Sequence, residues 1–133
     1  MAILTTWDNS SKNTVHVEFE SEWSWDDLEA AIDKTDRLIA SVPHHVDIII
    51  DVEGSSIPKD FMNAAKNLLA NPEPRDNEGR RIVVGAGKMM RTAYSAVQKT
   101  FGEKLVGREL LFADDLTQAR AILYSLRLEE RGQ

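Results

Sequence analysis

Several features that would narrow the function of this chain are missing from its sequence. Its 133 residues include no cysteine, which excludes disulfides, thiolate metal ligands and a thiol nucleophile. Its apolar runs are far shorter than the roughly 20 residues that cross a bilayer, so no membrane association is expected. The first residues lack a basic region followed by an apolar stretch, so we expect no secretory signal and a cytoplasmic location.

Basic charge is also scarce. Lys and Arg number 16 against 22 Asp and Glu, which gives a net charge of -6. The charges are spread along the chain, and an acidic surface repels phosphate groups. We therefore expect neither a nucleic-acid nor an anionic-membrane partner, and we attribute the charge to solubility.

The remaining composition is ordinary for a globular protein. Hydrophobic residues make up 42% and charged residues 29%, and the length suits one domain. The sequence shows no internal repeat and no linker. We expect a single domain over residues 1–128 and a frayed tail over 129–133.

Apolar patterns divide the chain into alternating strands and helices. Alternating or continuous apolar runs predict five strands, over residues 2–6, 14–20, 46–52, 81–86 and 109–113. A spacing of three and four predicts helices that follow four of these strands: one from Ser24 to about 42, one over 58–70, one over 88–100, and one capped by Asp114. Residues 71–80 (NPEPRDNEGR) read as a long polar loop.

The first helix has the clearest start. Ser24 is the predicted N-cap, Asp27 completes a capping box, and Trp23 and Leu28 stand at the staple positions. Its predicted buried face is Leu28, Ala31, Ile32, Thr35, Leu38, Ile39 and Val42. The order β-β-α-β-α-β-α-β-α predicts an α/β fold with a mixed, mostly parallel sheet, four helices and an antiparallel opening hairpin.

Three segments carry a resemblance to a known family. They are VDIIIDV before the second helix, RIVVGAGKMMRTAYSAVQKTFGEKL, and LLFADDLTQARAIL. Over about residues 3–126 the chain resembles the STAS-like superfamily, the fold of bacterial anti-anti-sigma factors and of the cytoplasmic domain of sulfate transporters. It is similar in particular to small stand-alone bacterial members. The resemblance implies a regulatory protein that binds another protein, of the kinase or anti-sigma type.

The phosphorylation motif of the anti-anti-sigma members, Asp-Ser-[Ser/Thr]-Gly, is absent. The corresponding segment is DVEGSSIPKDF, in which Ser55 and Ser56 lie earlier in the loop. Two interpretations stay open for these serines. They serve turn and capping chemistry, or one of them is a phosphoacceptor beside a parallel strand, where Asp51 and Glu53 would oppose the added charge.

The sequence Gly85-Ala86-Gly87 invites comparison with a nucleotide loop. Met90 stands where a dinucleotide fingerprint needs its third glycine, and the phosphate-loop Gly-Lys-[Ser/Thr] is absent. One interpretation is a tight strand-to-helix turn. The other is a helix N-terminus that holds a phosphate or carboxylate beside Lys88 and Arg91.

The histidines predict no catalytic or metal site. His44 and His45 are adjacent in a turn, and no cysteine or carboxylate cluster flanks them. His16 falls on the solvent face of the second strand, with no nucleophile paired to it by sequence.

The paired carboxylates have a structural interpretation as well. Asp26-Asp27 and Asp114-Asp115 lie at predicted helix starts, where acids favour the helix dipole. No catalytic constellation remains, and we expect a protein that is not an enzyme and holds no metal or cofactor.

A set of large apolar residues is interpreted as core, with a ligand groove or protein interface as the alternative: Trp7, Trp23, Trp25, Met62, Met89 and Met90.

The sequence thus predicts a non-enzymatic protein-binding module of STAS-like type. Its partner is expected at two loops, residues 53–60 and 85–91, which adjoin if the third and fourth strands pair. The candidate binding residues are Ser55, Ser56, Lys59, Gly85, Gly87, Lys88 and Arg91. The alternative is a small-molecule binding protein that holds an apolar or anionic ligand at the same loops. A homodimer also remains open.

Overall fold

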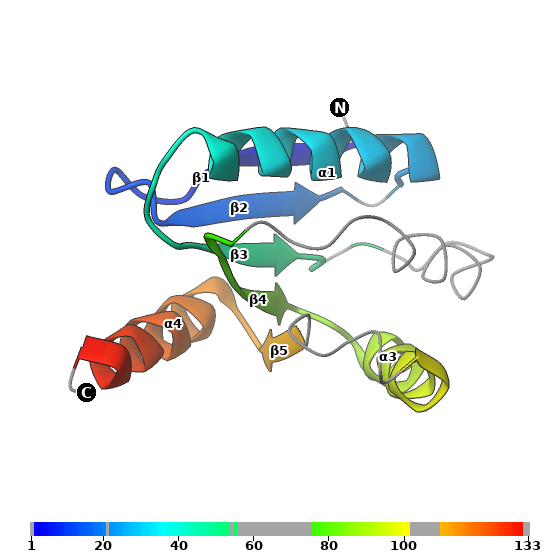
Figure 1. The fold of residues 1–133 in the computed structure, drawn as a ribbon. Coiled ribbons are helices and arrows are strands. Elements are labelled where there is room, and N and C mark those ends of the chain that lie inside the picture. The colour runs from blue at the N-terminus through cyan, green and yellow to red at the C-terminus, as the bar shows by residue number, and fades with distance from the viewer. Residues whose placement is uncertain (1, 21, 54, 56–75, 102–109, 132–133) are drawn as a thin grey trace.

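A computed structural model describes residues 2–20, 22–53, 55, 76–101 and 110–131 (Figure 1). The predicted second helix over 58–70 lies outside the described residues, as do Ser56, Lys59 and Met62. The described part contains five strands and three helices: β1 (Ile3–Trp7), β2 (Thr14–Phe19), α1 (Trp25–Ala40), β3 (Val46–Asp51), β4 (Glu78–Val84), α3 (Lys88–Phe101), β5 (Leu110–Ala113) and α4 (Leu116–Arg131).

The strands form one sheet in their chain order, β1-β2-β3-β4-β5. β1 and β2 pair antiparallel, and the three remaining pairs are parallel. The prediction of an α/β fold with a mostly parallel sheet and an antiparallel opening hairpin is confirmed. The carboxyl ends of β2 to β5 therefore lie at one edge of the sheet, where α/β proteins concentrate their binding loops.

The start of α1 follows the prediction. The Ser24 hydroxyl accepts from the Asp27 N–H at 3.1 Å, and the Asp27 carboxylate accepts from the Ser24 N–H at 2.9 Å. Trp23 and Leu28 both pack against the core. The helix ends at Ala40, and Ser41 is its C-cap.

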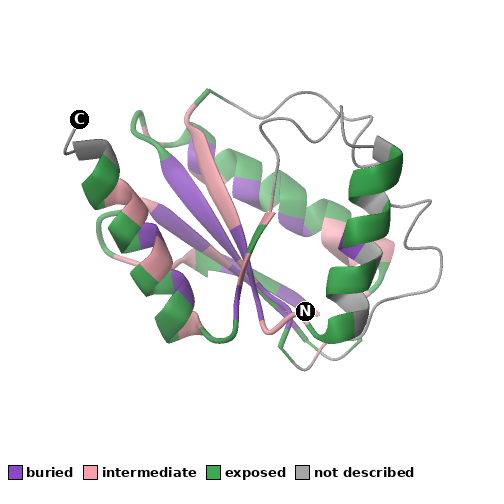
Figure 2. Cartoon of the chain, turned by 90° about the horizontal axis from the view of Figure 1, so that it is seen from below, coloured by how far each residue is buried: buried purple, intermediate pink, exposed green. Residues whose placement is uncertain are grey.

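The sheet carries one hydrophobic layer on each face, and its strands are largely buried (Figure 2). Ile48 and Ile49 are neighbours in β3, so their side chains point to opposite faces. Ile48 belongs to the layer under α1, with Ile3, Val15, Val17, Phe19, Ala31, Ile39, Val46, Val52 and Val83. Ile49 belongs to the layer under α4, with Ile82, Val84, Ala113, Ala119 and Leu123.

The buried face of α1 is narrower than predicted. Ala31, Thr35 and Ile39 form one buried row at a spacing of four residues. Ile32, predicted to be buried, is 39% exposed. It stands about 100° around the helix from Ala31, which turns it away from the sheet.

The last three residues of the predicted polar loop over 71–80 belong to β4, so that part of the prediction was wrong. Residues 78–80 were assigned to a loop, but β4 begins at Glu78. The carbonyl of Asn77 accepts from the Val46 N–H at 2.8 Å, and the Asp47 carboxylate accepts from the Arg80 N–H at 2.7 Å. Pairing with β3 thus makes the polar residues 78–80 part of the strand. At its other end, β4 stops at Val84, whereas the prediction extended it to residue 86.

The start of α4 differs by one residue from the prediction. Asp115, not Asp114, accepts from the Gln118 N–H, at 2.7 Å, and the helix begins at Leu116. The N–H of Asp114 instead donates to the Gln118 side chain at 2.6 Å. At its other end α4 continues to Arg131, into the segment that was expected to fray.

Candidate functional site

The two loops that were predicted to form a site follow β3 and β4, and these strands are paired as expected. Asp51 lies opposite Val84 at the end of the pair. The Val52 N–H then donates to the Val84 carbonyl at 3.0 Å, and the Gly85 N–H donates to the Ala113 carbonyl at 3.1 Å. The segments that leave β3, β4 and β5 are therefore joined by backbone hydrogen bonds.

Gly85 brings the first two loops into contact. Its φ of 74° lies in the left-handed region that side chains rarely adopt. A Cβ at this position would lie 2.7 Å from the Glu53 Cβ and 2.9 Å from the Glu53 Cα. Glycine here permits both the turn and the close approach of the β3 loop, which supports the interpretation as a tight turn.

Gly87 has a different role. A Cβ there would meet nothing within 4 Å, so the space around it is open. Its carbonyl accepts the first helical hydrogen bond of α3, from the Arg91 N–H at 3.1 Å. Gly87, Lys88 and Arg91 are all exposed at the start of α3.

Arg91 is the best-defined cation of this corner. Its guanidinium carbon lies 5.3 Å from the centroid of the Phe112 ring, and one nitrogen lies 3.6 Å from the Asp114 carboxylate. The side chains of Arg91 and Asp114 are 48% and 81% exposed. Such an exposed pair contributes about 1 kcal/mol or less, so another anion can replace Asp114 at little cost.

The Phe112 ring that lies under Arg91 is itself fixed by α3. Phe112 meets Tyr94 edge to face at a centroid distance of 5.5 Å, and the Tyr94 hydroxyl accepts from the Leu110 N–H at 2.9 Å. Tyr94 is buried, so this contact ties the first turns of α3 to β5.

Ser55 is held from the other side, by the segment before α1. The Trp23 indole N–H donates to the Ser55 hydroxyl at 3.0 Å. The Trp23 ring stands edge to face with Phe19 and Trp25, at centroid distances of 5.1 and 5.2 Å. Trp23 therefore contacts both the core and the loop after β3.

A histidine–carboxylate pair was missed by the sequence reasoning. The Nε2 of His16 lies 3.2 Å from the Oδ2 of Asp51, and the two side chains are only 16% and 12% exposed. The other oxygen of Asp51 accepts from the Glu53 N–H at 3.2 Å, at the start of the β3 loop. His16 was expected on the solvent face with no nucleophile paired to it, and instead it is largely buried beside Asp51, at the base of the candidate site.

The chemistry that these residues offer is electrostatic. Arg91 pairs with Asp114, and Lys88, Asp51 and Glu53 lie at or just beyond the ends of β3 and β4, so both signs of charge are present at this edge of the sheet. Within the described ranges, no group of three or more His, Cys, Asp or Glu side chains could hold a metal ion.

The other predicted candidates are separate from this site. The Nε2–H of His44 donates to the Lys12 carbonyl at 2.9 Å, in the opening hairpin, and His45 is exposed. Ser56 and Lys59 lie outside the described residues, and the Met89 and Met90 side chains are not described. A cavity of about 70 Å³ lies elsewhere, between β1 and α1.

Comparison with protein-family models, with curated proteins and with solved structures finds no match for this chain. Among the residues that the structure describes, no helix has the length and apolar character needed to cross a membrane.

Proposed function

We propose that this chain is a non-enzymatic regulatory module of STAS-like type that binds a protein partner through the loops after β3 and β4. The observation that carries the proposal is the contact between Gly85 and Glu53, which joins the two loops into one surface. Lys88 and Arg91 stand exposed beside that contact at the first turn of α3.

The position of this surface supports a binding role. It lies beyond the carboxyl ends of parallel strands, where ligands and partners of open α/β sheets bind. The weak Arg91–Asp114 pair leaves a cation that a carboxylate or phosphate of the partner can take over. The proposed partner is therefore a protein that presents an acidic group, and a kinase or an anti-sigma regulator is the class that the family resemblance implies.

Ser55 is the described candidate for a phosphoacceptor. A phosphate there would add about two negative charges next to Asp51 and Glu53. It would also replace the hydrogen bond that the Trp23 indole donates to the hydroxyl. We propose that such a modification would weaken the joined loops and release the partner. Phosphopeptide mapping of the chain from stressed cells tests this, and a Ser55 that is never phosphorylated would remove the switch.

Binding of a small anionic ligand is the second candidate function. It is favoured by the exposed N-terminal turn of α3, where a backbone N–H and two cations can share one anion. Native mass spectrometry of the freshly purified chain would show the added mass. A spectrum of the bare chain, together with no thermal shift in inorganic phosphate, would contradict this candidate.

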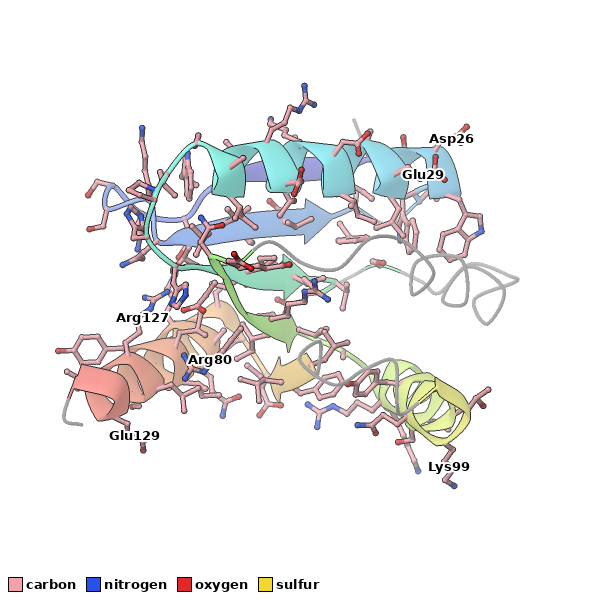
Figure 3. All side chains as sticks on the ribbon, viewed as in Figure 1. Asp26, Glu29, Arg80, Lys99, Arg127 and Glu129 are labelled. Atoms are coloured by element: carbon pink, nitrogen blue, oxygen red, sulfur yellow. The ribbon has the colours of Figure 1, made fainter. Side chains whose placement is uncertain are left out.

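Photo-crosslinking in cells of the source organism tests the partner-binding proposal. A photo-reactive amino acid replaces Lys88, Arg91 or Lys99, one position in each variant. Lys99 is the matched control because it lies in the last turn of the same helix and extends away from the sheet (Figure 3). We expect one discrete crosslinked protein from positions 88 and 91 and none from 99. Equal crosslinking at all three positions, or none at 88 and 91, would contradict the proposal.

A further inference from the structure

β1 is an outer strand of the sheet, and the pattern of its hydrogen bonds shows which groups point away from β2. The Asp8 N–H donates to the Thr14 carbonyl, and the Glu20 N–H donates to the Ala2 carbonyl, both at 2.8 Å. In an antiparallel pair, bonded residues alternate with residues whose backbone groups point outward. Ala2 and Asp8 are bonded positions, and so are the residues at even spacing between them.

The residues between these bonded positions therefore direct their backbone N–H and C=O groups to the open side of β1. They are Ile3, Thr5 and Trp7. Within the described part of the chain, no strand pairs with this side. Proteins usually protect such an edge with charged residues, proline or a very short strand. β1 reads ILTTW over five residues and carries none of these.

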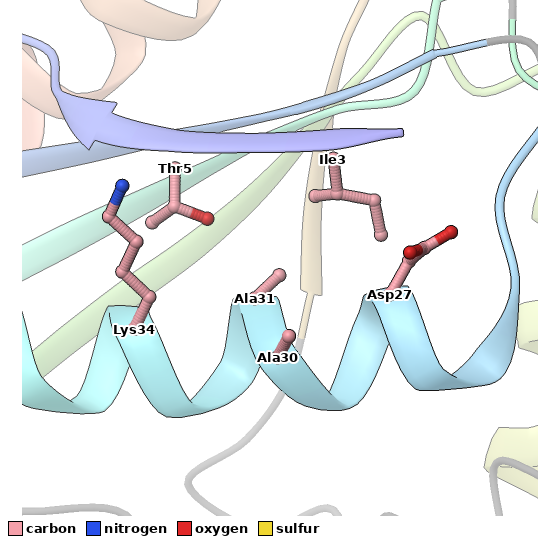
Figure 4. Close-up of a pocket in the computed structure, with 6 residues that line it drawn as sticks. All are labelled: Ile3, Thr5, Asp27, Ala30, Ala31 and Lys34. Carbon is pink, nitrogen blue, oxygen red and sulfur yellow. The ribbon is translucent and has the colours of Figure 1, made fainter. Parts of the chain in front are cut away.

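A cavity of about 70 Å³ adjoins this edge (Figure 4). The side chains of Ile3 and Thr5 enter it from β1, Ala30 and Ala31 from α1, and Lys34 and Asp27 stand toward its two ends. The small alanines leave the space open. The volume is about half that of a cavity that holds benzene, so it suits one short side chain.

Thr5 lines this cavity, and its buried hydroxyl beside the cavity has no hydrogen-bond partner among the described residues. Thr5 is 3% exposed, and among the described buried side chains its oxygen is the one atom left without a partner. Buried polar groups are normally satisfied, so this hydroxyl is free to bond a polar atom that enters the cavity. At the rim, Lys34 is exposed and forms no ion pair with any described residue.

We propose that an extended peptide segment of a partner protein adds to β1 as a further strand and places an aspartate side chain in this cavity. The backbone groups of Ile3, Thr5 and Trp7 would hold the peptide, as in other cases where a strand is added to a sheet edge. The Thr5 hydroxyl donates to the aspartate carboxylate, and Lys34 supplies the opposite charge. This site is separate from the loops after β3 and β4 and does not depend on their function.

A second copy of the chain fits this site less well than a peptide does. If the β1 strands of two copies paired, the side chains of Ile3 and Thr5 in each copy would still point toward the α1 of that same copy, where Ile3 packs in the core. They could not also enter the cavity of the other copy. Pairing of two copies would therefore leave the cavity empty and the Thr5 hydroxyl without a partner.

The probe is a synthetic heptapeptide, acetyl-Thr-Val-Thr-Asp-Thr-Val-Thr-amide, added to the full chain and followed by NMR. We expect saturable shifts of the Ile3, Thr5 and Trp7 amides. Replacing the peptide aspartate by alanine should weaken binding about tenfold, because a charge-assisted hydrogen bond is lost. Methylation of alternate peptide nitrogens should abolish binding, because strand addition needs these donors.

Variants of the chain test whether the aspartate side chain of the peptide binds in the cavity between β1 and α1. Ala30→Leu fills the cavity from an exposed helical position and should abolish binding, whereas Ala40→Leu, also exposed on α1, should not. Thr5→Val keeps the shape and should weaken the aspartate peptide about tenfold without affecting the alanine peptide. Lys34→Gln should likewise reduce the preference for aspartate.

Three results would overturn the proposal. They are no saturable shift in β1, shifts at residues 85–91 in place of β1, and unchanged binding by the Ala30→Leu variant. Sedimentation at the NMR concentration detects the second-copy alternative, since a β1-paired dimer that excludes the peptide would also contradict us. Binding should survive in the Lys88→Gln/Arg91→Gln variant, which separates this proposal from the one at the loops.

Discussion

Arg127 and Asp47 lie 80 residues apart in the chain and are joined by two hydrogen bonds, from Nε at 3.0 Å and from Nη2 at 2.7 Å. The Arg127 guanidinium also donates to the Thr14 hydroxyl at 2.7 Å and to the Asn13 carbonyl at 3.1 Å. The second oxygen of Asp47 accepts from the Arg80 N–H. This cluster fastens α4 to the amino ends of β2, β3 and β4, opposite the edge that carries the candidate site.

Breaking this pair should destabilise the fold strongly. Arg127→Met keeps an unbranched apolar stem but leaves the Asp47 carboxylate, 7% exposed, without its cation. We expect a loss of about 3 kcal/mol in the free energy of unfolding, measured by urea denaturation. Arg91→Met removes an exposed pair and should cost about 1 kcal/mol or less. Equal losses in the two variants would show that the Asp47 pair is not a buried anchor.

Gly85 should tolerate no side chain. Gly85→Ala introduces a left-handed alanine whose Cβ meets Glu53, so we expect a loss of about 2 kcal/mol or more. Gly87→Ala enters open space before α3 and should cost about 1 kcal/mol or less. Thermal unfolding of the two variants makes the comparison. A Gly85→Ala variant as stable as Gly87→Ala would contradict the described turn.

The cap of α4 can be assigned by a pair of neighbouring substitutions. Asp115→Ala removes the oxygen that accepts from the Gln118 N–H and should cost about 1 kcal/mol. Asp114→Ala leaves that bond in place and should cost less. If Asp114→Ala were the more destabilising change in urea denaturation, the helix would begin one residue earlier than the structure shows.

The contact between Trp23 and Ser55 should be visible in the indole resonances. Ser55→Ala leaves the indole N–H without its acceptor, so we expect a shift of one of the three indole ¹H–¹⁵N signals and a loss of about 1 kcal/mol. Ser10→Ala, an exposed change in the opening hairpin, serves as the control. Unmoved indole signals in Ser55→Ala would mean that the bond is absent in solution.

Local signals explain which parts of the fold were predictable. The cap of α1 depends on Ser24, Asp27 and their immediate neighbours, and it was predicted correctly. The start of β4 depends instead on the backbone of β3 and on the Asp47 side chain, which accepts from Arg80. Residues 78–80 contain no local pattern that indicates pairing with β3 or with Asp47, so from sequence the segment resembled a loop.

The missed parts of the candidate site depend on register between distant strands. His16 lies opposite Ile49, which places Asp51 diagonally across on the same face. A shift of one residue would have sent the two side chains to opposite faces. The cavity at β1 is equally non-local, because alanines at 30 and 31 create space only where β1 passes beside them.

The affinity of the crosslinked partner for charge variants tests the central proposal most directly. Calorimetry with the purified partner compares the Lys88→Gln/Arg91→Gln chain with the Lys99→Gln chain and with the unchanged protein. We predict binding at least about tenfold weaker for the double variant, a difference of about 1.4 kcal/mol, and unchanged binding for Lys99→Gln. Equal affinity of all three chains would contradict docking at the loops after β3 and β4.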